Sequence, residues 1–517
     1  MALSLHARPR PDLELNLVDA REAIEGFREL VEAELASEGE HWRLEIDDEP
    51  VAVEHGAGQS RWRWKPSFYA GEVRARLVDL RGGAEHVLRL DVSPNPDKLG
   101  RDRFAEIIAE LRQAQPEFVL GSEPATTRTG SLGQLDDPLL AYGKLRTYAK
   151  DFLSSLERVL AAPVRRLRQE RRMLALAQVR RADRRTVFQA LRNPQLASLL
   201  VGQEQPANSG PAPRLDAPVV EPHVDEAANR CIKALTQSVL RRVVDCRERL
   251  AVKVERERES GTRTTLAERW PVRERYLLGL ERHLVRALRG PVLSAVTRAQ
   301  ITAGGLNTIS AHPVYSRTYK LGWRTLGLGF EGEPRDEDLW LPPTWELYER
   351  WCFVTARRLL RESFGFEELA TVTSPPADLA WSGSDGAGRR VWLGFQVKCA
   401  TWSMKKEHEF RSLNVTRFPD LVVSVETGDS ARWIVLDAKY RVSRANVLDA
   451  MTSAHLYHDA LRWRGHPPER ALLVVPAAGG APWLEKDAFH QAHGVGVVVA
   501  RPRCTNRLEQ ALAALLG

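Results

Sequence analysis

Alternating hydrophobic and polar positions dominate the first 125 residues and predict a β-rich domain. Four short segments place an apolar side chain at every second position, as strands with one face in a core do: residues 42–46, 51–53, 73–78 and 87–92. Residues 20–36 and 103–113 instead repeat their apolar positions at helical spacing. Because turn residues separate the strands, we predict a small antiparallel sandwich or barrel with a helix at each end.

Helical spacing takes over between positions 126 and 335. Residues 225–259 and 272–289 have the period of long helices, and residues 138–200 show a helical pattern rich in arginine. Residues 203–222, by contrast, contain several prolines and no periodicity, which predicts a loop. We interpret residues 315–323, which mix aromatic and basic side chains, as a connecting segment.

The last block of the chain predicts a mixed α/β domain with the element order α-β-β-β-α-β. Its elements are expected at residues 344–362, 391–397, 420–425, 433–439, 445–463 and 472–475, with a further buried strand at 495–499. The whole chain is therefore predicted to be a multidomain α+β protein. Its parts are a β-rich N-terminal recognition or docking domain (1–125), an Arg-rich helical region (126–335) and a C-terminal α/β domain (336–517).

Composition narrows the class of protein without naming its chemistry. None of the apolar runs in the 517 residues approaches the ~20 residues that cross a bilayer, and the charged first residues do not resemble a signal peptide. Five scattered cysteines without metal-ligand spacing favour reduced thiols, so we expect a cytoplasmic protein with no membrane segment. The net charge of +7 fits a nucleic-acid partner but does not demonstrate one.

One predicted hairpin brings acidic residues into the core of the C-terminal domain. Two apolar strands flank a polar turn at 426–429; Asp420 precedes the first strand, and Asp437 lies near the end of the second. Residues two apart on a strand share a face, so Asp437 and Lys439 project together. If the strands pair, Asp420 approaches Asp437, and two carboxylates can then hold a hard divalent cation beside an ammonium group. This arrangement suits metal-assisted phosphodiester hydrolysis, and a purely structural ion pair is the alternative.

The helix upstream of the hairpin offers a third carboxylate. Glu349 is the preferred candidate, and Glu346 is the reserve because residues three apart nearly share a helix face. On the helix after the hairpin, His455 and Asp459 are four residues apart and could face the same cleft. The Gln-Val-Lys triplet at 396–398 is interpreted as a coincidental match, because no acid precedes it in hairpin register.

These residues resemble the signature of the PD-(D/E)xK nucleases. A Pro-Asp pair ending at Asp420 and the triplet Asp437-Ala438-Lys439 match its motif, and the predicted element order matches its fold. The resemblance implies that Asp420 and Asp437 bind Mg²⁺ or Mn²⁺, with the backbone carbonyl of Ala438 completing the shell. It also implies that Lys439 is the catalytic lysine and that Glu349 is the helix acid found in many members.

A narrower resemblance, to McrC-like (LlaJI-type) restriction components, covers most of the chain. It is carried by the sequence context at 347–351, 437–441 and 455–460 and by the helix at 224–235. Such components have an N-terminal domain of unknown function and typically work with an AAA+ NTPase of the McrB type. The resemblance implies a Mg-dependent DNA endonuclease subunit of a bacterial restriction or anti-phage defence complex. The alternatives are a catalytically silent McrC-like adaptor that binds DNA and stimulates the NTPase, and an RNA-directed nuclease.

Basic and aromatic side chains supply candidate nucleic-acid contacts outside the acidic cluster. The candidates are Arg165, Arg166, Arg168, Arg172, Arg441, Trp62 and Trp64. Arginines would bind phosphate without reading sequence, but an Arg-rich run is as often a solvated face. The two tryptophans alternate with cations, so they either stack on a base or pack in the core of a sheet. The chain has no G-x-x-x-x-G-K-[ST] loop, so any NTP-driven step requires a partner chain; a homo-oligomer is also compatible with the sequence.

Overall fold

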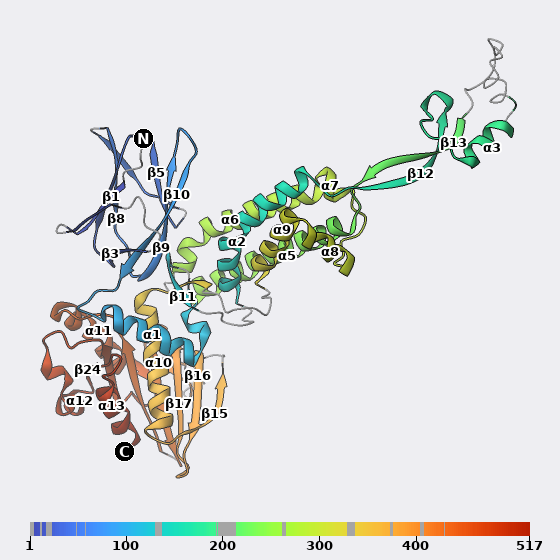
Figure 1. Ribbon diagram of the computed structural model, residues 1–517. Coiled ribbons are helices and arrows are strands. Elements are labelled where there is room, and N and C mark those ends of the chain that lie inside the picture. Colours follow the sequence, from blue (N-terminus) through green and yellow to red (C-terminus); the bar gives the residue numbers. More distant parts are fainter. Residues whose placement is uncertain are drawn as a thin grey trace. The chain divides into compact units, whose positions relative to one another are not determined.

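Contacts divide the chain into two compact units (Figure 1). Unit 1 combines Met1–Leu140, Arg263–Arg269 and Pro334–Gly517, and unit 2 combines Ala141–Thr262 and Trp270–Glu333. The division differs from the three consecutive domains predicted from the sequence, because the first and last blocks of the chain share one set of contacts. The computed structural model describes residues 5–10, 13–16, 23–47, 49–56, 58–121, 123–129, 137–192, 194, 214–260, 265–327, 337–372, 376–403, 408–428 and 430–517.

The N-terminal part of unit 1 is built from two β-sheets. Their strands are β1 (Leu5–Arg10), β2 (Leu13–Asn16), β3 (Ile24–Arg28), β4 (Ala33–Glu38), β5 (Trp42–Ile46), β6 (Glu49–Pro50), β7 (Val53–Gly56), β8 (Gln59–Trp64), β9 (Gly71–Asp79), β10 (Glu85–Ser93), β11 (Ala125–Thr129) and β14 (Glu337–Trp340). One sheet has the order β2-β1-β4-β8-β7, and the other has the order β14-β11-β9-β10-β3 with β5 beside β9. Phe27, Leu35, Trp62, Val73 and Leu90 meet in one core. The β-rich character predicted for the N-terminal region is confirmed.

The segment at residues 20–36 forms two strands instead of the predicted helix. β3 and β4 belong to different sheets and are separated by a turn in which Leu30 has a φ of +64°. Along β4, buried and more exposed side chains alternate. Its few apolar positions fit a period of two as well as a helical period, and pairing with β1 and β8 decided between them. The strand predicted at 51–53 is also displaced, because β6 ends before it and β7 begins at Val53.

Helix α1 (Gly100–Ala114) lies where the sequence predicted a helix, but it packs on the C-terminal domain. Phe104, Ile107 and Leu111 share a hydrophobic core with Leu347 and Trp351. A strand from the C-terminal side of the chain is likewise part of the N-terminal sheet: β14, which precedes the C-terminal domain, pairs with β11. In unit 1 the N-terminal and C-terminal parts of the chain therefore each contribute an element to the other's core or sheet.

The C-terminal domain has one seven-stranded sheet between two layers of helices. Its elements are α10 (Thr344–Glu362), β15 (Glu367–Val372), β16 (Ala377–Ser384), β17 (Arg390–Val397), β20 (Leu421–Thr427), β21 (Ser430–Ala438), α11 (Arg444–Ala460), β23 (Arg470–Val475), α12 (Asp487–His493), β24 (Val495–Val499) and α13 (Asn506–Leu516). The strand order is β15-β16-β17-β20-β21-β23-β24. Helices α1, α10 and α13 share a core on one face of the sheet, and α11 packs on the other (Figure 1). The predicted fold class is confirmed, although β15 and β16 were not predicted.

Unit 2 consists of helices and a long two-stranded ribbon. Its elements are α2 (Pro138–Ala161), β12 (Arg166–Ala175), α3 (Arg184–Arg192), β13 (Arg214–His223), α5 (Ala227–Ser260), α6 (Thr265–Arg289), α7 (Pro291–Ser294), α8 (Ala303–Ala311) and α9 (Pro313–Leu326), with α2 and α6 starting in unit 1. Helices α5 and α6 confirm the two predicted long helices. β12 and β13 pair antiparallel along ten residues each and extend away from the helices of this unit (Figure 1).

Three predictions for this region are wrong. Residues 166–175 form a strand, not part of an Arg-rich helix; residues 214–222 belong to β13, not to a loop; and residues 315–323 lie within α9. The rest of the predicted loop, 203–213, lies outside the described residues. The ribbon has few buried side chains, and cross-strand ion pairs such as Arg172 with Glu221 at 2.9 Å take the place of a core. A pattern search for apolar periodicity therefore has little to detect in β12.

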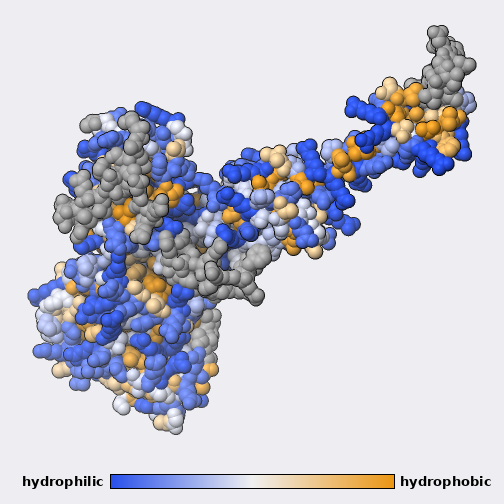
Figure 2. Space-filling model, in the orientation of Figure 1, coloured by the Kyte–Doolittle hydropathy of each residue, from blue (hydrophilic) through white to orange (hydrophobic). Residues whose placement is uncertain are grey.

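Helix α3, at the far end of the ribbon, exposes apolar side chains. Val187, Phe188 and Leu191 are 47%, 48% and 62% exposed, and arginines surround them (Figure 2). Exposed apolar clusters bordered by charge are typical of protein contact sites.

None of the helices in the described part of the chain is long and apolar enough to cross a membrane.

Candidate active site

The β20–β21 hairpin brings the two predicted aspartates together. Leu421 pairs with Leu436, so Asp420 and Asp437 occupy facing positions at the end of this ladder. Lys439 Nζ contacts both of their carboxyl groups, and both side chains are buried. The predicted approach of Asp420 to Asp437 is present in the fold. The turn is shorter than the predicted 426–429, because Glu426 and Thr427 belong to β20 and pair with β21; Asp429 lies outside the described residues.

Lys439 places its ammonium group between the two carboxylates. Its Nζ donates to Asp437 Oδ1 at 2.9 Å and to Asp420 Oδ2 at 3.4 Å. The backbone N–H of Ala438 donates to Asp420 Oδ2 at 2.9 Å and fixes that side chain against the strand. The alternation predicted for β21 holds as well, because Ala438 points into the core beneath α10.

Glu349 reaches the same cluster from α10, and Gln396 connects it to the hairpin. Gln396 Nε2 donates to Glu349 Oε2 and to Asp420 Oδ1, each at 3.2 Å. The interpretation of residues 396–398 as a coincidental match is therefore wrong for Gln396. Its φ of +50° is unusual for a residue other than glycine, asparagine or aspartate, and such strain is found where a side chain must be aimed. Glu346, the reserve candidate, forms an ion pair with Arg350 instead.

Helix α11 contributes Ser453 and Tyr457, which the sequence did not single out. Ser453 Oγ donates to Asp437 Oδ2 at 2.7 Å, and Tyr457, one turn later, donates to the carbonyl of Phe418 at 3.4 Å. His455 and Asp459 lie on the other side of the helix, where both are exposed. The prediction that they face the cleft is wrong, because Ser453 and Tyr457 already occupy the face that points to β21.

The segment that contains this cluster matches a nuclease family. Residues 346–475 match the PD-(D/E)XK nuclease superfamily. The matched segment contains Glu349, Gln396, Asp420, Asp437 and Lys439. The PD-(D/E)xK resemblance noted in the sequence is confirmed, and the match supports a nuclease.

The other comparisons add little about activity. Residues 66–302 match the family described as domain of unknown function (DUF2357), which spans parts of both units. No curated protein matches the chain. A solved structure titled polysaccharide lyase aligns at 11% identity over 64% of this chain and 53% of its own length, with a TM-score of 0.13. A similarity that low carries no argument about fold or activity.

Burial determines the electrostatics of the candidate site. Desolvation, reinforced by the neighbouring carboxylate of Asp437, raises the pKa of Asp420 to about 8. Desolvation and Asp420 likewise raise the pKa of Glu349 well above its usual range. Burial alone would lower the pKa of Lys439, but the attraction of Asp420 and Asp437 outweighs it and raises that pKa. The lysine is therefore charged at neutral pH. A bound cation would favour the ionised forms of Asp420 and Glu349, which burial disfavours.

The donors of the site suit a hard divalent cation. Glu349, Asp420 and Asp437 outnumber the single ammonium group, and carboxylate oxygens are the ligands that Mg²⁺ prefers. Among the described residues, no three Asp, Glu, His or Cys side chains form a complete ligand set. This is compatible with Mg²⁺, which keeps several waters and usually takes one or two carboxylates together with substrate phosphates.

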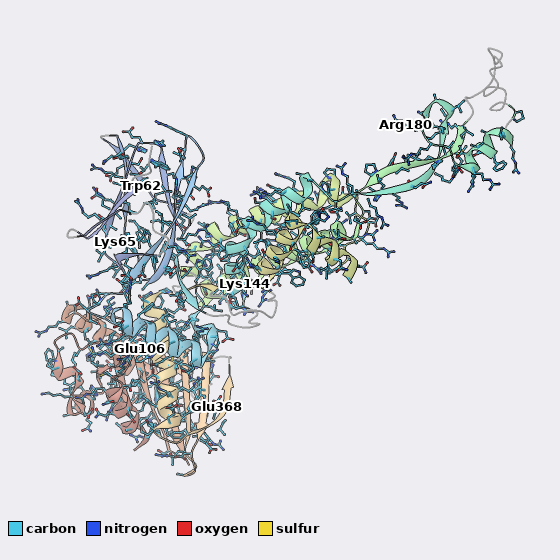
Figure 3. The ribbon with its side chains drawn as sticks, in the orientation of Figure 1. Trp62, Lys65, Glu106, Lys144, Arg180 and Glu368 are labelled. Carbon is cyan, nitrogen blue, oxygen red and sulfur yellow. The ribbon has the colours of Figure 1, made fainter. Side chains whose placement is uncertain are left out.

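Except for Arg441, the other predicted nucleic-acid contacts lie far from this cluster along the chain. Trp62, which Figure 3 labels, and Trp64 are buried in the N-terminal core, so the proposed stacking on a base is not retained. Arg166, Arg168 and Arg172 lie on β12, which Arg165 directly precedes, and their exposed side chains leave phosphate contact a prediction. Arg441 lies two residues after Lys439. Its guanidinium donates to Asp449 at 2.6 Å and to the carbonyl of Asn446, and these two contacts hold the side chain against α11.

Gln396→Ala is expected to lower the cleavage rate by about 10- to 100-fold, because the amide that aligns Glu349 with Asp420 is lost. Gln396→Asn keeps an amide and tolerates the left-handed backbone, so it should retain more activity. Gln396→Gly relieves the backbone strain without restoring the amide and serves as the matched control. Single-turnover cleavage and melting temperature separate the two effects. Equal rates for the alanine and asparagine variants would contradict the amide's role.

Proposed function

We propose that this chain is a Mg²⁺-dependent DNA endonuclease, the cutting subunit of a bacterial restriction or anti-phage defence complex. The observation that carries the proposal is the buried cluster of Asp420, Asp437 and Lys439, joined by Glu349, within the segment that matches the nuclease superfamily. A purely structural ion pair would not need two facing carboxylates and a third acid in one core, because unpaired buried charge is costly.

Asp420 and Asp437 would hold the metal, with the carbonyl of Ala438 and with Glu349 contributing to its shell or its waters. A bound Mg²⁺ supplies a Lewis acid at the scissile phosphate and lowers the pKa of the attacking water. Lys439 keeps its proton at Nζ and donates to the phosphate oxygens as negative charge develops on them. Ser453 holds Asp437 Oδ2, and Gln396 holds Glu349 and Asp420, so the acids keep their orientation through the reaction.

A cavity of about 870 Å³ opens on the face of the sheet that carries Asp437, and none of the residues of the acidic cluster lines it. Arg390, Lys398 and His408 line it together with Trp392 and Trp463. Arg390 and Lys398 suit the DNA backbone, whose phosphates supply most of the binding free energy, and Glu409 and Glu426 line the same cavity. This surface supports DNA as the substrate more directly than the Arg-rich ribbon does, because it lies on the same sheet as the acids.

Plasmid cleavage tests the proposed function. Supercoiled DNA, unmodified and modified, is incubated with Mg²⁺ or Mn²⁺ and the wild-type chain, with and without a candidate AAA+ partner. Cleavage that EDTA and Asp437→Asn both abolish supports the proposal. Asp459→Asn is the matched control, because this exposed acid on α11 lies outside the cluster. Absence of cleavage even with the partner would favour the adaptor that binds DNA and stimulates the NTPase.

We propose that the partner is an AAA+ NTPase of the McrB type and that it contacts the exposed apolar side chains of α3. The double variant Phe188→Glu and Leu191→Glu should then reduce stimulation of the partner's NTPase by about 10-fold or more, because charge replaces apolar contact area. Metal-dependent cleavage by the chain alone should not change. Val252→Glu on α5, also an exposed apolar position, is the control. Normal stimulation by the α3 variant would exclude this surface.

A further inference from the structure

A buried carboxylate from the N-terminal sandwich touches two segments that build the nuclease site. The side chain of Glu29, which follows β3, is fully buried. Its Oε1 accepts a hydrogen bond from the backbone N–H of Asn95 at 3.0 Å and from the hydroxyl of Tyr440 at 3.3 Å. Its Oε2 accepts one from the hydroxyl of Thr344 at 2.9 Å. One carboxylate therefore joins the N-terminal domain to two places in the C-terminal domain.

Lys98 completes this junction. Its Nζ is 3.9 Å from Glu29 Oε1 and 4.2 Å from the centre of the Tyr440 ring, and only a tenth of its side chain is exposed. The carbonyl of Phe68 accepts a hydrogen bond from the backbone N–H of Thr344 at 2.9 Å, which adds a backbone contact beside the ionic one. A buried charge pair with this many directed partners fixes geometry more strictly than an apolar contact, because its hydrogen bonds tolerate little displacement.

The two segments that Glu29 holds carry residues of the proposed site. Thr344 begins α10, the helix of Glu349, and Tyr440 directly follows Lys439. We propose that Glu29 is a positioning residue through which the N-terminal domain sets the placement of Glu349 and Lys439, an inference that rests on the proposed nuclease function. A recognition event in the N-terminal domain that shifts β3 or the turn at 94–98 would reach the site through these bonds.

Two variants test the inference. Glu29→Gln combined with Lys98→Met removes both buried charges together, and Tyr440→Phe removes one hydroxyl and leaves the ring in the core. Glu106→Gln is the matched control, because this acid of α1 forms an ion pair with Arg503 of the C-terminal domain and touches neither segment (Figure 3). Each protein is measured for single-turnover cleavage, affinity for a labelled duplex and melting temperature. Hydrogen exchange is followed at residues 344–349 and 437–441.

The double variant is expected to cleave about 10- to 100-fold more slowly and Tyr440→Phe about 3- to 10-fold more slowly, since small misplacements of reacting groups are costly. DNA affinity should stay unchanged, and exchange should rise at both segments; the Glu106 variant should behave like wild type. Unchanged exchange in the double variant, or cleavage within twofold of wild type, would overturn the inference. If the wild type does not cleave, the proposed function fails, and the exchange data still test the coupling.

Discussion

Lys439→Met is expected to reduce DNA cleavage by about 100- to 1000-fold, the effect of removing one preorganised donor from a charge-stabilising site. The ammonium of Lys439 lies within 3.4 Å of both aspartates, and their attraction keeps it charged. Methionine preserves the length of the side chain but donates no hydrogen bond to the phosphate. The rate should fall in single-turnover assays, where chemistry rather than product release is measured.

The affinity for DNA separates this effect from a loss of binding. Lys439→Met should bind a labelled duplex within a few-fold of wild type, because one of many phosphate contacts is lost. Ser443→Ala, which removes the N-cap of α11 close by in sequence, reports on general disturbance of this region. Cleavage by the methionine variant at near wild-type rates would show that Lys439 is a structural counter-ion of Asp437 and Asp420.

Glu349→Gln is expected to stabilise the protein without metal while lowering cleavage by about 100-fold. Burial and the nearby carboxylate of Asp420 raise the pKa of Glu349 in the folded protein, so the ionised form destabilises the fold. Glutamine has the same shape, carries no charge and still accepts the hydrogen bond of Gln396 Nε2. A gain of about 1–2 kcal/mol in the free energy of unfolding is expected, as for other stabilising changes at functional sites. For a unit of roughly 330 residues it corresponds to about 1–2 °C per kcal/mol in melting temperature.

The pH dependence checks the cause of that gain. An acid whose folded pKa is raised binds more protons in the folded state than in the unfolded state, so it destabilises increasingly as the pH rises above the unfolded pKa of about 4.3. In EDTA, the stability difference between Glu349→Gln and wild type should therefore be near zero at pH 4 and largest at pH 8. Added Mg²⁺ should stabilise wild type more than the variant. A difference that does not change with pH would assign the effect to packing instead of charge.

Local pattern was enough to place most of the C-terminal domain. The strands β17, β20 and β21 and the helices α10 and α11 follow from short apolar runs, turns and caps, and the match to the nuclease superfamily covers them. Local pattern failed where two periods fit equally well, as in β3 and β4, or where a core is nearly absent, as in β12. In both places a partner strand far along the chain decided the conformation.

The sequence by itself determined the hairpin and the residues on it, because a tight turn and a period of two are properties of neighbouring residues. Asp420, Asp437 and Lys439 could be named on that basis. Only the tertiary structure placed Gln396 and Ser453 against these acids and Glu29 behind them, because those contacts join elements that meet when the sheet, α11 and the N-terminal sandwich pack together. The residues of the candidate site can thus be recognised from local sequence. Their alignment depends on contacts between residues as far as 411 positions apart in the chain.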